Sequence, residues 1–291
     1  MIPRSFEYSA PGTLDEAISL LRKLGPDAKI LSGGQSLIPM MKLRLASPPH
    51  IVDINRIPGL DYIRETSGFL RIGALVRESD LEKSELVRSR FPILVDTTSV
   101  IADPLVRNQA TVCGNLAHGD PANDHPATML ALGASVVALG PRGEREIPVE
   151  SFFPGLFTTA LEPDEILKEI KIPIPPPSTG GAYLKLERKV GDFATAGVAV
   201  QITLDGSGKC SRAGIGLTNV GFTPLKAVKA EAFVTGKTLD ESTIKQASEL
   251  AAGESQPVDD IRGSADYKRD LVRVLTARAL TRAIARAKGG V

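Results

Sequence analysis

Apolar side chains recur at helical spacing near the start of the chain, where they predict an amphipathic helix over residues 13–24. Thr13 is expected to cap this helix, while the side chain of Glu16 reaches back to a backbone N–H group that lacks a partner inside the helix. A Gly-Pro pair at residues 25–26 ends it, because proline cannot continue a helix.

Short apolar runs further along predict strands, and helical spacing returns between them. The strands are expected at residues 29–31, 50–54 and 69–74, and the helices at residues 81–86 and 93–101. The segment that follows carries Gly, Asn, Asp and Pro at close intervals. We expect residues 102–124 to be irregular and functional, because long irregular segments are usually functional or disordered and this one also contains Val and Leu.

A proline-rich stretch divides the second half of the chain from the first. Residues 173–181 combine four prolines with a Gly-Gly pair, which is typical of a linker. Beyond it, the pattern predicts a hairpin with its turn at residues 205–209, followed by two helices. The expected strands and helices span residues 196–204, 213–217, 240–252 and 267–287. The basic residues of the last helix are expected to form a solvated face, with a partner-binding face as the alternative.

Composition narrows the class of protein. With 291 residues, of which 42% are hydrophobic, the chain is long enough for two or three domains of ordinary size. The formal net charge of +1 provides no clustered positive field for nucleic acid. Two cysteines indicate no disulfide scaffold and favour a reduced, cytoplasmic compartment. No signal-peptide core or membrane-spanning stretch is evident, so we expect a soluble protein, or one held at a membrane only through partners.

Two glycine-bearing segments carry the clearest candidate chemistry. The first glycine segment reads Ser-Gly-Gly-Gln-Ser at residues 32–36, and the second glycine segment reads Thr-Val-Cys-Gly-Asn at residues 111–115. Glycine lets the backbone approach a ligand closely and adopt positive φ, so that successive N–H groups converge on an anion. Neutral hydroxyl and amide donors then suit a pyrophosphate between two nucleoside halves. Each segment, taken singly, is better explained as a tight turn, because short glycine-rich strings are weak evidence for a ligand site.

Other motifs fail on spacing. Gly236-Lys237-Thr238 resembles the end of a P-loop, but Glu231 stands where that motif needs glycine. Gly214 and Gly216 begin a Rossmann-like pattern that Asn219 breaks, in a segment expected to be a strand. No P-loop ATPase and no Rossmann dinucleotide fold is therefore expected.

A metal site is not expected either. His118 and His125 are seven residues apart, with proline and glycine between them, which matches no standard ligand spacing. The simpler interpretation is a solvated loop in which Asp124 caps a helix that begins near Pro126. An iron–sulfur cluster needs about four thiolates, so the two cysteines are expected to be ordinary core or loop residues. No catalytic residue is assigned.

The ordered set of motifs resembles the medium, flavin-binding subunit of the xanthine dehydrogenase and carbon monoxide dehydrogenase family, and most of all its carbon monoxide dehydrogenase branch. The resemblance covers essentially the whole chain. The segments that carry it are residues 1–3, 32–42, 101–104, 111–115, 119–124, 183–189, 191–196 and 216–220.

The resemblance implies an α+β fold. A two-subdomain FAD-binding fold of the PCMH/vanillyl-alcohol-oxidase type would be followed by a C-terminal domain with an antiparallel sheet and helices. The first subdomain would span residues 1–55, the second residues 56–177, and the C-terminal domain residues 178–291.

The resemblance also implies that FAD lies between the two glycine segments, which would hold its pyrophosphate and nearby flavin atoms. Asp124 would bond the nucleotide part, while Leu167 and Lys185 would lie near the flavin ring, with Asp192 and Phe193 close by. The expected cofactor-binding residues are Ile30, Leu31, Ser32, Gly33, Gly34, Gln35, Ser36, Leu37, Thr111, Val112, Cys113, Gly114, Asn115, Asp124, Leu167, Lys185, Asp192 and Phe193.

Two positions depart from the family pattern. Cys113 stands where the family usually has a second glycine, so we expect less backbone freedom in that segment. Gln35 stands where the family often has histidine, so a neutral amide donor replaces a group that can be protonated.

The function implied by the resemblance is electron transfer. The chain would take electrons from the [2Fe–2S] clusters of a small partner subunit and pass them through FAD to an external acceptor. A large partner subunit would hold the molybdenum cofactor and the substrate, in a dimer of heterotrimers. Carbon monoxide, aldehydes and N-heterocycles are candidate substrates, and a quinone, a cytochrome or NAD⁺ is the candidate acceptor.

Two alternatives remain open. A free-standing FAD-dependent oxidoreductase would need a pocket for its own small-molecule substrate, and the aromatic content of 4% disfavours this. An assembly module that has lost FAD is disfavoured by the intact glycine segments.

Overall fold

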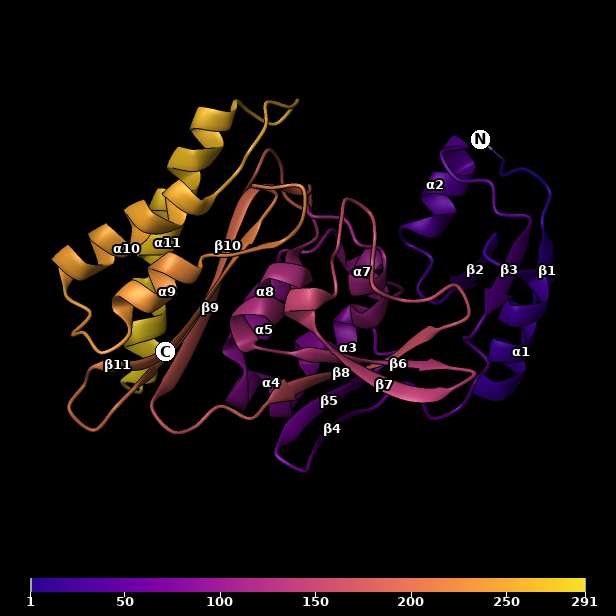
Figure 1. Ribbon diagram of the computed structural model, residues 1–291, viewed down its shortest axis with the longest axis horizontal. Coiled ribbons are helices and arrows are strands. Elements are labelled where there is room, and N and C mark those ends of the chain that lie inside the picture. Colours follow the sequence, from indigo (N-terminus) through magenta and orange to yellow (C-terminus); the bar gives the residue numbers. More distant parts are fainter. Residues whose placement is uncertain (1, 291) are drawn as a thin grey trace.

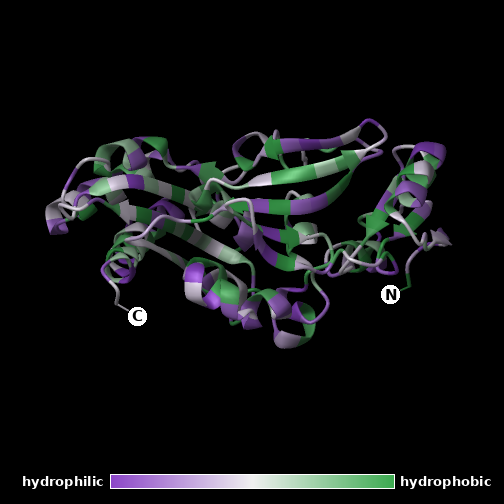
Figure 2. Ribbon diagram, turned by 90° about the horizontal axis from the view of Figure 1, so that it is seen from below, coloured by the Kyte–Doolittle hydropathy of each residue, from purple (hydrophilic) through white to green (hydrophobic). Residues whose placement is uncertain are grey.

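The computed structural model describes residues 2–290 and arranges them around three β-sheets. In Figure 1 the N-terminal unit, in indigo, lies at one end of the long axis, and the last helices, in orange and yellow, lie at the other. Hydrophobic and hydrophilic residues alternate along several strands (Figure 2), as expected where one face of a strand is buried. Each sheet packs on its own hydrophobic core.

A small parallel sheet forms the N-terminal unit. Its elements are β1 (Glu7–Ser9), α1 (Leu14–Leu24), β2 (Ala28–Leu31), α2 (Leu37–Leu43) and β3 (His50–Asp53). The strands lie in the order β1-β3-β2. Thr13 caps α1 by accepting a hydrogen bond from the Glu16 N–H at 3.2 Å, as predicted. The Glu16 carboxylate accepts from the Gly12 N–H at 2.8 Å, one residue earlier than a capping box would place that bond.

An antiparallel sheet of five strands forms the middle of the molecule, in the order β4-β5-β8-β6-β7. The strands are β4 (Ile63–Thr66), β5 (Phe69–Gly73), β6 (Ser135–Gly140), β7 (Gly143–Pro148) and β8 (Ile166–Pro173). The helices between β5 and β6 are α3 (Glu78–Lys83), α4 (Glu85–Arg90), α5 (Pro92–Ser99), α6 (Pro104–Arg107), α7 (Val112–Ala117) and α8 (Asp124–Leu132). Only β5 was expected among these strands, so the sheet itself was not foreseen.

The C-terminal sheet has the order β12-β11-β10-β9. Its elements are β9 (Thr179–Glu187), β10 (Ala194–Leu204), β11 (Cys210–Thr218) and β12 (Leu225–Lys226), followed by α9 (Val228–Val234), α10 (Glu241–Glu254) and α11 (Ala265–Ala287). Helix α11 packs on β9 and β10, and α8 packs on β10 and β11. Gly214 and Gly216 permit this contact, because a side chain at either position would collide with the backbone of α8. Their spacing therefore serves helix–sheet packing.

The segment between Ile101 and Asp124 is more regular than expected. It contains α6 and α7, which have four and six residues. Helices this short are hard to predict from the spacing of apolar residues, since one helical turn already takes about 3.6 residues. Asp124 is the first residue of α8, and Asn123 occupies the cap position. Both residues are buried, so the prediction of a solvated loop with an Asp124 cap is wrong.

Two predictions for the second half of the chain are also wrong in part. Gly180 and Gly181 belong to β9 and not to a linker. Helix α11 lies so close that a side chain at Gly180 would collide with its backbone, which explains the glycine at this position. The connection to the C-terminal sheet is thus reduced to residues 174–178.

The basic last helix does not present a uniformly solvated face. The Lys268 ammonium is buried and lies 2.7 Å from the Asp260 carboxylate. The Arg286 guanidinium lies 2.6 Å from Asp96, on the neighbouring helix α5. No helix in the described part of the chain is both long and apolar enough to cross a bilayer.

Candidate functional site

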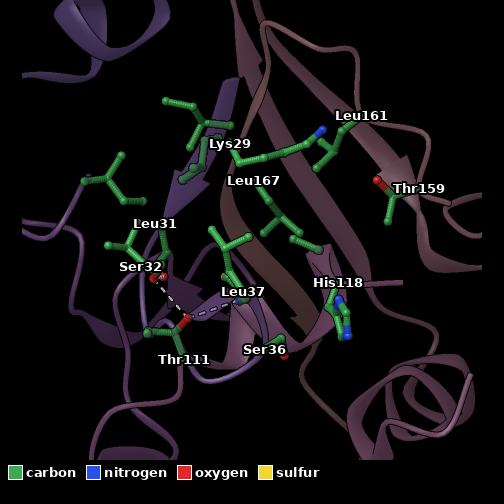
Figure 3. Close-up of a pocket in the computed structure, with 18 of the residues that line it drawn as sticks. Lys29, Leu31, Ser32, Ser36, Leu37, Thr111, His118, Thr159, Leu161 and Leu167 are labelled. Atoms are coloured by element: carbon green, nitrogen blue, oxygen red, sulfur yellow. Dashed lines mark hydrogen bonds between the residues drawn. The ribbon is translucent and has the colours of Figure 1, made fainter. Parts of the chain in front are cut away.

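A large cavity opens between the N-terminal unit and the middle sheet. Its volume is about 600 Å³, within the usual range for sites that bind small molecules and cofactors. Strand β2, the turn into α2, helix α7 and the segment that leads into β8 supply its wall (Figure 3). The cavity therefore brings together segments that are more than a hundred residues apart in sequence.

The two glycine segments touch each other in the wall of this cavity. A Cβ atom on Gly33 would lie 2.5 Å from the Gln109 carbonyl oxygen and 2.8 Å from the Thr111 nitrogen, which is closer than real side chains approach. The hydroxyl groups of Ser32 and Thr111 form a hydrogen bond of 3.0 Å across the contact. Gly34 has a φ of 74°, a conformation that L side chains rarely adopt. Close approach thus requires glycine at position 33, and backbone conformation favours it at position 34.

Free backbone donors line the cavity along the first glycine segment. The N–H groups of residues 33–37 donate to no acceptor within residues 2–290, although the Gly34 and Ser36 carbonyls accept from Ile38 and Met40. The Cys113 N–H is likewise without an acceptor in the described chain. A row of N–H groups at the start of a helical turn is a favourable environment for an anion.

The second glycine segment is the beginning of a helix, so the expectation that residues 102–124 are irregular is wrong here. Thr111 caps α7 by accepting a hydrogen bond from the Gly114 N–H at 3.2 Å. The Val112 N–H donates to the Val76 carbonyl at 3.1 Å, which ties the start of α7 to the segment after β5. The Val112 side chain is buried in the core of the middle sheet and does not line the cavity.

Most of the expected cofactor-binding residues line the cavity: residues 30–37, Thr111, Cys113, Gly114, Asn115 and Leu167. The Asn115 side-chain oxygen is buried and accepts no hydrogen bond from any described residue, so it can accept one from a ligand. Burial raises the pKa of the Cys113 thiol well above its usual range. This side chain is therefore a neutral, unreactive part of the wall.

Other lining residues were not singled out from the sequence. They include Lys29, His118, Thr159 and Leu161, which Figure 3 labels around the cavity. His118 was weighed only as a metal ligand. Its ring centre lies 5.6 Å from that of Phe157, and burial lowers its pKa below the usual value. Thr159 and Leu161 lie in an irregular segment, where no periodic signal could have indicated them.

Asp124 and Lys185 lie outside the cavity wall, in a separate buried group with Tyr183 that we call the Asp124 cluster. The Lys185 ammonium lies 3.0 Å from the Asp124 carboxylate and donates to the Val100 carbonyl at 2.7 Å. The Tyr183 hydroxyl donates to the other Asp124 oxygen at 2.5 Å. Burial raises the pKa of Asp124, opposed by the nearby Lys185 charge. One residue away, Asn123 donates to the Asn115 carbonyl at 2.8 Å and links the cluster to the cavity.

Asp192 and Phe193 also lie outside the cavity wall, in the turn between β9 and β10. The Asp192 carboxylate pairs with Arg188 at 2.9 Å and with Arg262 at 3.2 Å. The Arg262 guanidinium lies 5.6 Å from the centre of the partly exposed Phe193 ring. The structure thus groups these two residues with each other and with the C-terminal domain.

The second histidine considered for metal binding lies in the core. His125 is fully buried, and its Nε2 lies 2.7 Å from the Glu78 carboxylate. Within residues 2–290, no group of three or more His, Cys, Asp or Glu side chains is arranged to hold a metal ion.

Two family models together match nearly the whole chain. Residues 4–175 match the FAD binding domain in molybdopterin dehydrogenase, and residues 181–283 match the CO dehydrogenase flavoprotein C-terminal domain. The chain belongs to the FAD-binding family of the molybdopterin dehydrogenases. The carbon monoxide dehydrogenase medium chain of Hydrogenophaga pseudoflava is 46% identical over 286 residues, which cover 98% of this chain and 99% of that protein.

Solved structures of the family superpose closely. Carbon monoxide dehydrogenase from Hydrogenophaga pseudoflava, in a form that lacks the Mo-pyranopterin moiety of the molybdenum cofactor, gives a TM-score of 0.95 at 48% identity and covers 98% of this chain and 99% of its own. Quinoline 2-oxidoreductase from Pseudomonas putida 86 gives a TM-score of 0.92 at 34% identity and covers 99% of both chains. These matches confirm the predicted family and the α+β fold class.

The chain is therefore an FAD-binding subunit of an oxidoreductase, of the medium type that occurs in complexes similar to carbon monoxide dehydrogenase. The cavity fits this cofactor on three physical grounds. It is large enough for an extended nucleotide, Gly33 lets the two glycine segments meet in its wall, and free N–H groups can meet the charge of a pyrophosphate.

Proposed function

We propose that this chain transfers electrons within a heteromeric molybdenum hydroxylase. In this proposal a small partner subunit with [2Fe–2S] clusters supplies electrons, and a large partner subunit with the molybdenum cofactor oxidises the substrate. Bound FAD supplies the redox chemistry that connects one-electron donors with an external acceptor. The protein residues bind FAD, orient it and exclude water around it.

The row of free N–H groups at residues 33–37 carries the proposal. Five adjacent residues leave their backbone donors without a protein acceptor beside a cavity of about 600 Å³, where one anionic ligand can meet several of them at once. A pyrophosphate on these donors would satisfy them and gain charge-assisted hydrogen bonds. Residues 30–37, Thr111 and residues 113–115 would then hold the middle of FAD, and Leu167 would contact it through apolar surface.

We assign the remaining expected residues less direct roles. Asp124 would reach the cofactor region through the link from Asn123 to Asn115, and Lys185 would contribute positive charge near the flavin ring. Asp192 and Phe193 would border the flavin from the turn between β9 and β10. Because the Asp124 cluster is already hydrogen-bonded, its contribution would be a fixed electrostatic field around the flavin.

The proposed division into modules follows the cores. Residues 1–55 and 56–177 would form the two FAD-binding subdomains, and residues 178–291 the C-terminal domain. Three sheets with largely separate hydrophobic clusters support this division.

The substrate is proposed only as a class. Relatives of this chain occur in a carbon monoxide dehydrogenase and in a quinoline oxidoreductase with nearly the same fold. Carbon monoxide, an aldehyde or an N-heterocycle would thus be chosen by the large subunit. The electron acceptor would be a quinone, a cytochrome or NAD⁺.

Purification of the chain from its native host tests the proposal. The released flavin is identified by chromatography, and the co-purifying chains by mass. We expect FAD with a smaller iron–sulfur chain and a larger molybdenum chain. A lone chain that carries FAD and reduces it with its own substrate would support the free-standing oxidoreductase instead.

A further inference from the structure

His118 places an imidazole in the wall of the cavity, where the only carboxylate paired with it among the described residues is that of Asp120. Its side chain is about 15% exposed, and within residues 2–290 its ring nitrogens make no hydrogen bond. The chain turns sharply at Gly119, where φ is 68° and a Cβ atom would lie 3.1 Å from the backbone of Phe157 and Thr158. The Phe157 ring packs on the imidazole. This corner therefore holds His118 in the cavity wall, and its ring nitrogens remain available to a ligand.

The charged groups around His118 leave the cavity wall close to neutral. The carboxylate of Asp120 lies 3.9 Å from Nε2, and the other ionisable residues of the wall are Lys29, Cys113, Glu162 and Glu165. Arg145 pairs with Glu165 at 2.6 Å, and the Cys113 thiol stays neutral because burial raises its pKa. Lys29 and Glu162 carry opposite charges. An anion that enters the cavity can thus gain a further cation by protonating the imidazole.

We propose that His118 takes up a proton when FAD binds, and that the imidazolium so formed helps to hold the pyrophosphate. The inference rests on the placement of FAD proposed above. Burial lowers the pKa of His118 in the ligand-free chain, whereas a diphosphate nearby raises it, because an opposite charge stabilises the protonated form. FAD therefore binds more tightly as the pH falls through the window between these two pKa values. The gain is up to about tenfold for each unit between them.

Rebinding of FAD to the full-length chain after removal of the cofactor tests this coupling. The affinity is measured by flavin fluorescence from about pH 5.5 to about pH 8.5, the range in which histidine titrates. Three chains are compared: the wild type, His118→Gln, and His50→Gln as a matched control. His50 lies in β3, outside the cavity wall. We expect the wild type and His50→Gln to lose about tenfold in affinity across the range, and His118→Gln to lose almost none.

Calorimetry in two buffers with different ionisation enthalpies measures the proton directly. Net uptake by the wild type near neutral pH, absent in His118→Gln, is the expected result. The inference is overturned if the variant keeps the pH slope of the wild type, or if the wild type takes up no proton.

If His118→Gln binds no FAD at any pH, the inference is tested on the wild type, by NMR of the histidine ring carbons with and without FAD. A pKa of His118 that rises on FAD binding, with His50 unchanged as internal reference, supports the inference, and an unchanged His118 pKa refutes it. A wild-type chain that fails to bind FAD would overturn the placement of FAD instead.

Discussion

The cavity between the glycine segments and the neighbouring Asp124 cluster are both built from polar groups, but they differ in how these groups are satisfied. Along the cavity, the N–H groups of residues 33–37 have no acceptor among the described residues. In the Asp124 cluster, Lys185 and Tyr183 occupy both carboxylate oxygens at 3.0 and 2.5 Å. The cavity is thus prepared for a ligand, whereas both carboxylate oxygens of Asp124 are already bonded within the protein.

This difference indicates how the two regions serve one cofactor. Unsatisfied donors favour binding, because the ligand removes their desolvation cost. A satisfied buried ion pair changes little when a ligand arrives, so it provides a constant field and a rigid connection between α8 and β9. Substitutions in the cavity should therefore affect FAD retention, and substitutions in the cluster should affect stability and flavin potential.

The largest loss of FAD affinity is expected from Gly33→Ala. The new Cβ atom would lie 2.5 Å from the Gln109 carbonyl oxygen, so the two glycine segments must separate. Overpacking of this kind costs about 1–3 kcal/mol, which would correspond to roughly a fivefold to 150-fold loss of FAD affinity. Flavin fluorescence titration measures it. Gly206→Ala, in an open turn with nothing within 4 Å of the added atom, is the matched control and should bind FAD normally.

Lys185→Met should lower the free energy of unfolding by about 3–5 kcal/mol, because it leaves the buried Asp124 charge with only part of its partners. Urea denaturation of the FAD-free chain measures this loss. The double variant Asp124→Asn/Lys185→Met should recover part of it. As a control, Lys168→Met removes a pair with Glu144 at the surface and should cost less than about 1 kcal/mol. Equal losses of unfolding free energy in Lys185→Met and Lys168→Met would show that the buried pair stabilises the fold no more than the surface pair.

The same Lys185→Met variant should lower the flavin midpoint potential by some tens of millivolts while FAD stays bound. Loss of a positive charge disfavours the reduced, more negative cofactor. Spectroelectrochemical titration of the complex measures the potential. The charge-balanced double variant should stay nearer the wild type, and an unchanged potential in Lys185→Met would refute a role for this charge.

The smallest effect is expected from Glu165→Gln at the edge of the cavity. The hydrogen bond from Arg145 lowers the pKa of Glu165 below its usual 4.5. A carboxyl group whose pKa is lower in the folded state adds stability above the unfolded pKa and loses it as the pH falls through the folded value. The variant should cost about 1–2 kcal/mol at neutral pH and show a flatter loss of stability below about pH 4.5. Thermal denaturation at a series of pH values measures both effects. The expectation is contradicted if the variant loses stability below about pH 4.5 as steeply as the wild type.

Much of the local structure could be predicted because it is encoded locally. The helix after Thr13 and the hairpin around residues 205–209 were confirmed, since caps, turn residues and periodicity act within a few positions. Helix α7 was missed because its six residues are too few to show a period. The middle sheet was missed because its strands pair across long stretches of helix, which no short window can detect.

Some residues of the candidate site could likewise be predicted from the sequence, and others could not. Motifs along the sequence indicated the glycine segments and the family, because residue types at short, ordered spacings can be recognised without the fold. His118 and Thr159 could not be chosen, since nothing near them in sequence shows that they face the same cavity. The close approach of Gly33 to Gln109 exists only in the folded chain.

The sequence by itself determined the family, the cofactor and the two segments that bound the cavity, because these depend on residue types at short, ordered spacings. The tertiary structure alone decided which donors remain free, which histidine enters the cavity wall, and that Asp124 and Lys185 satisfy each other. Such properties depend on chain segments that are distant in sequence. These segments decide whether a polar group is shielded from water and whether it finds a hydrogen-bond partner.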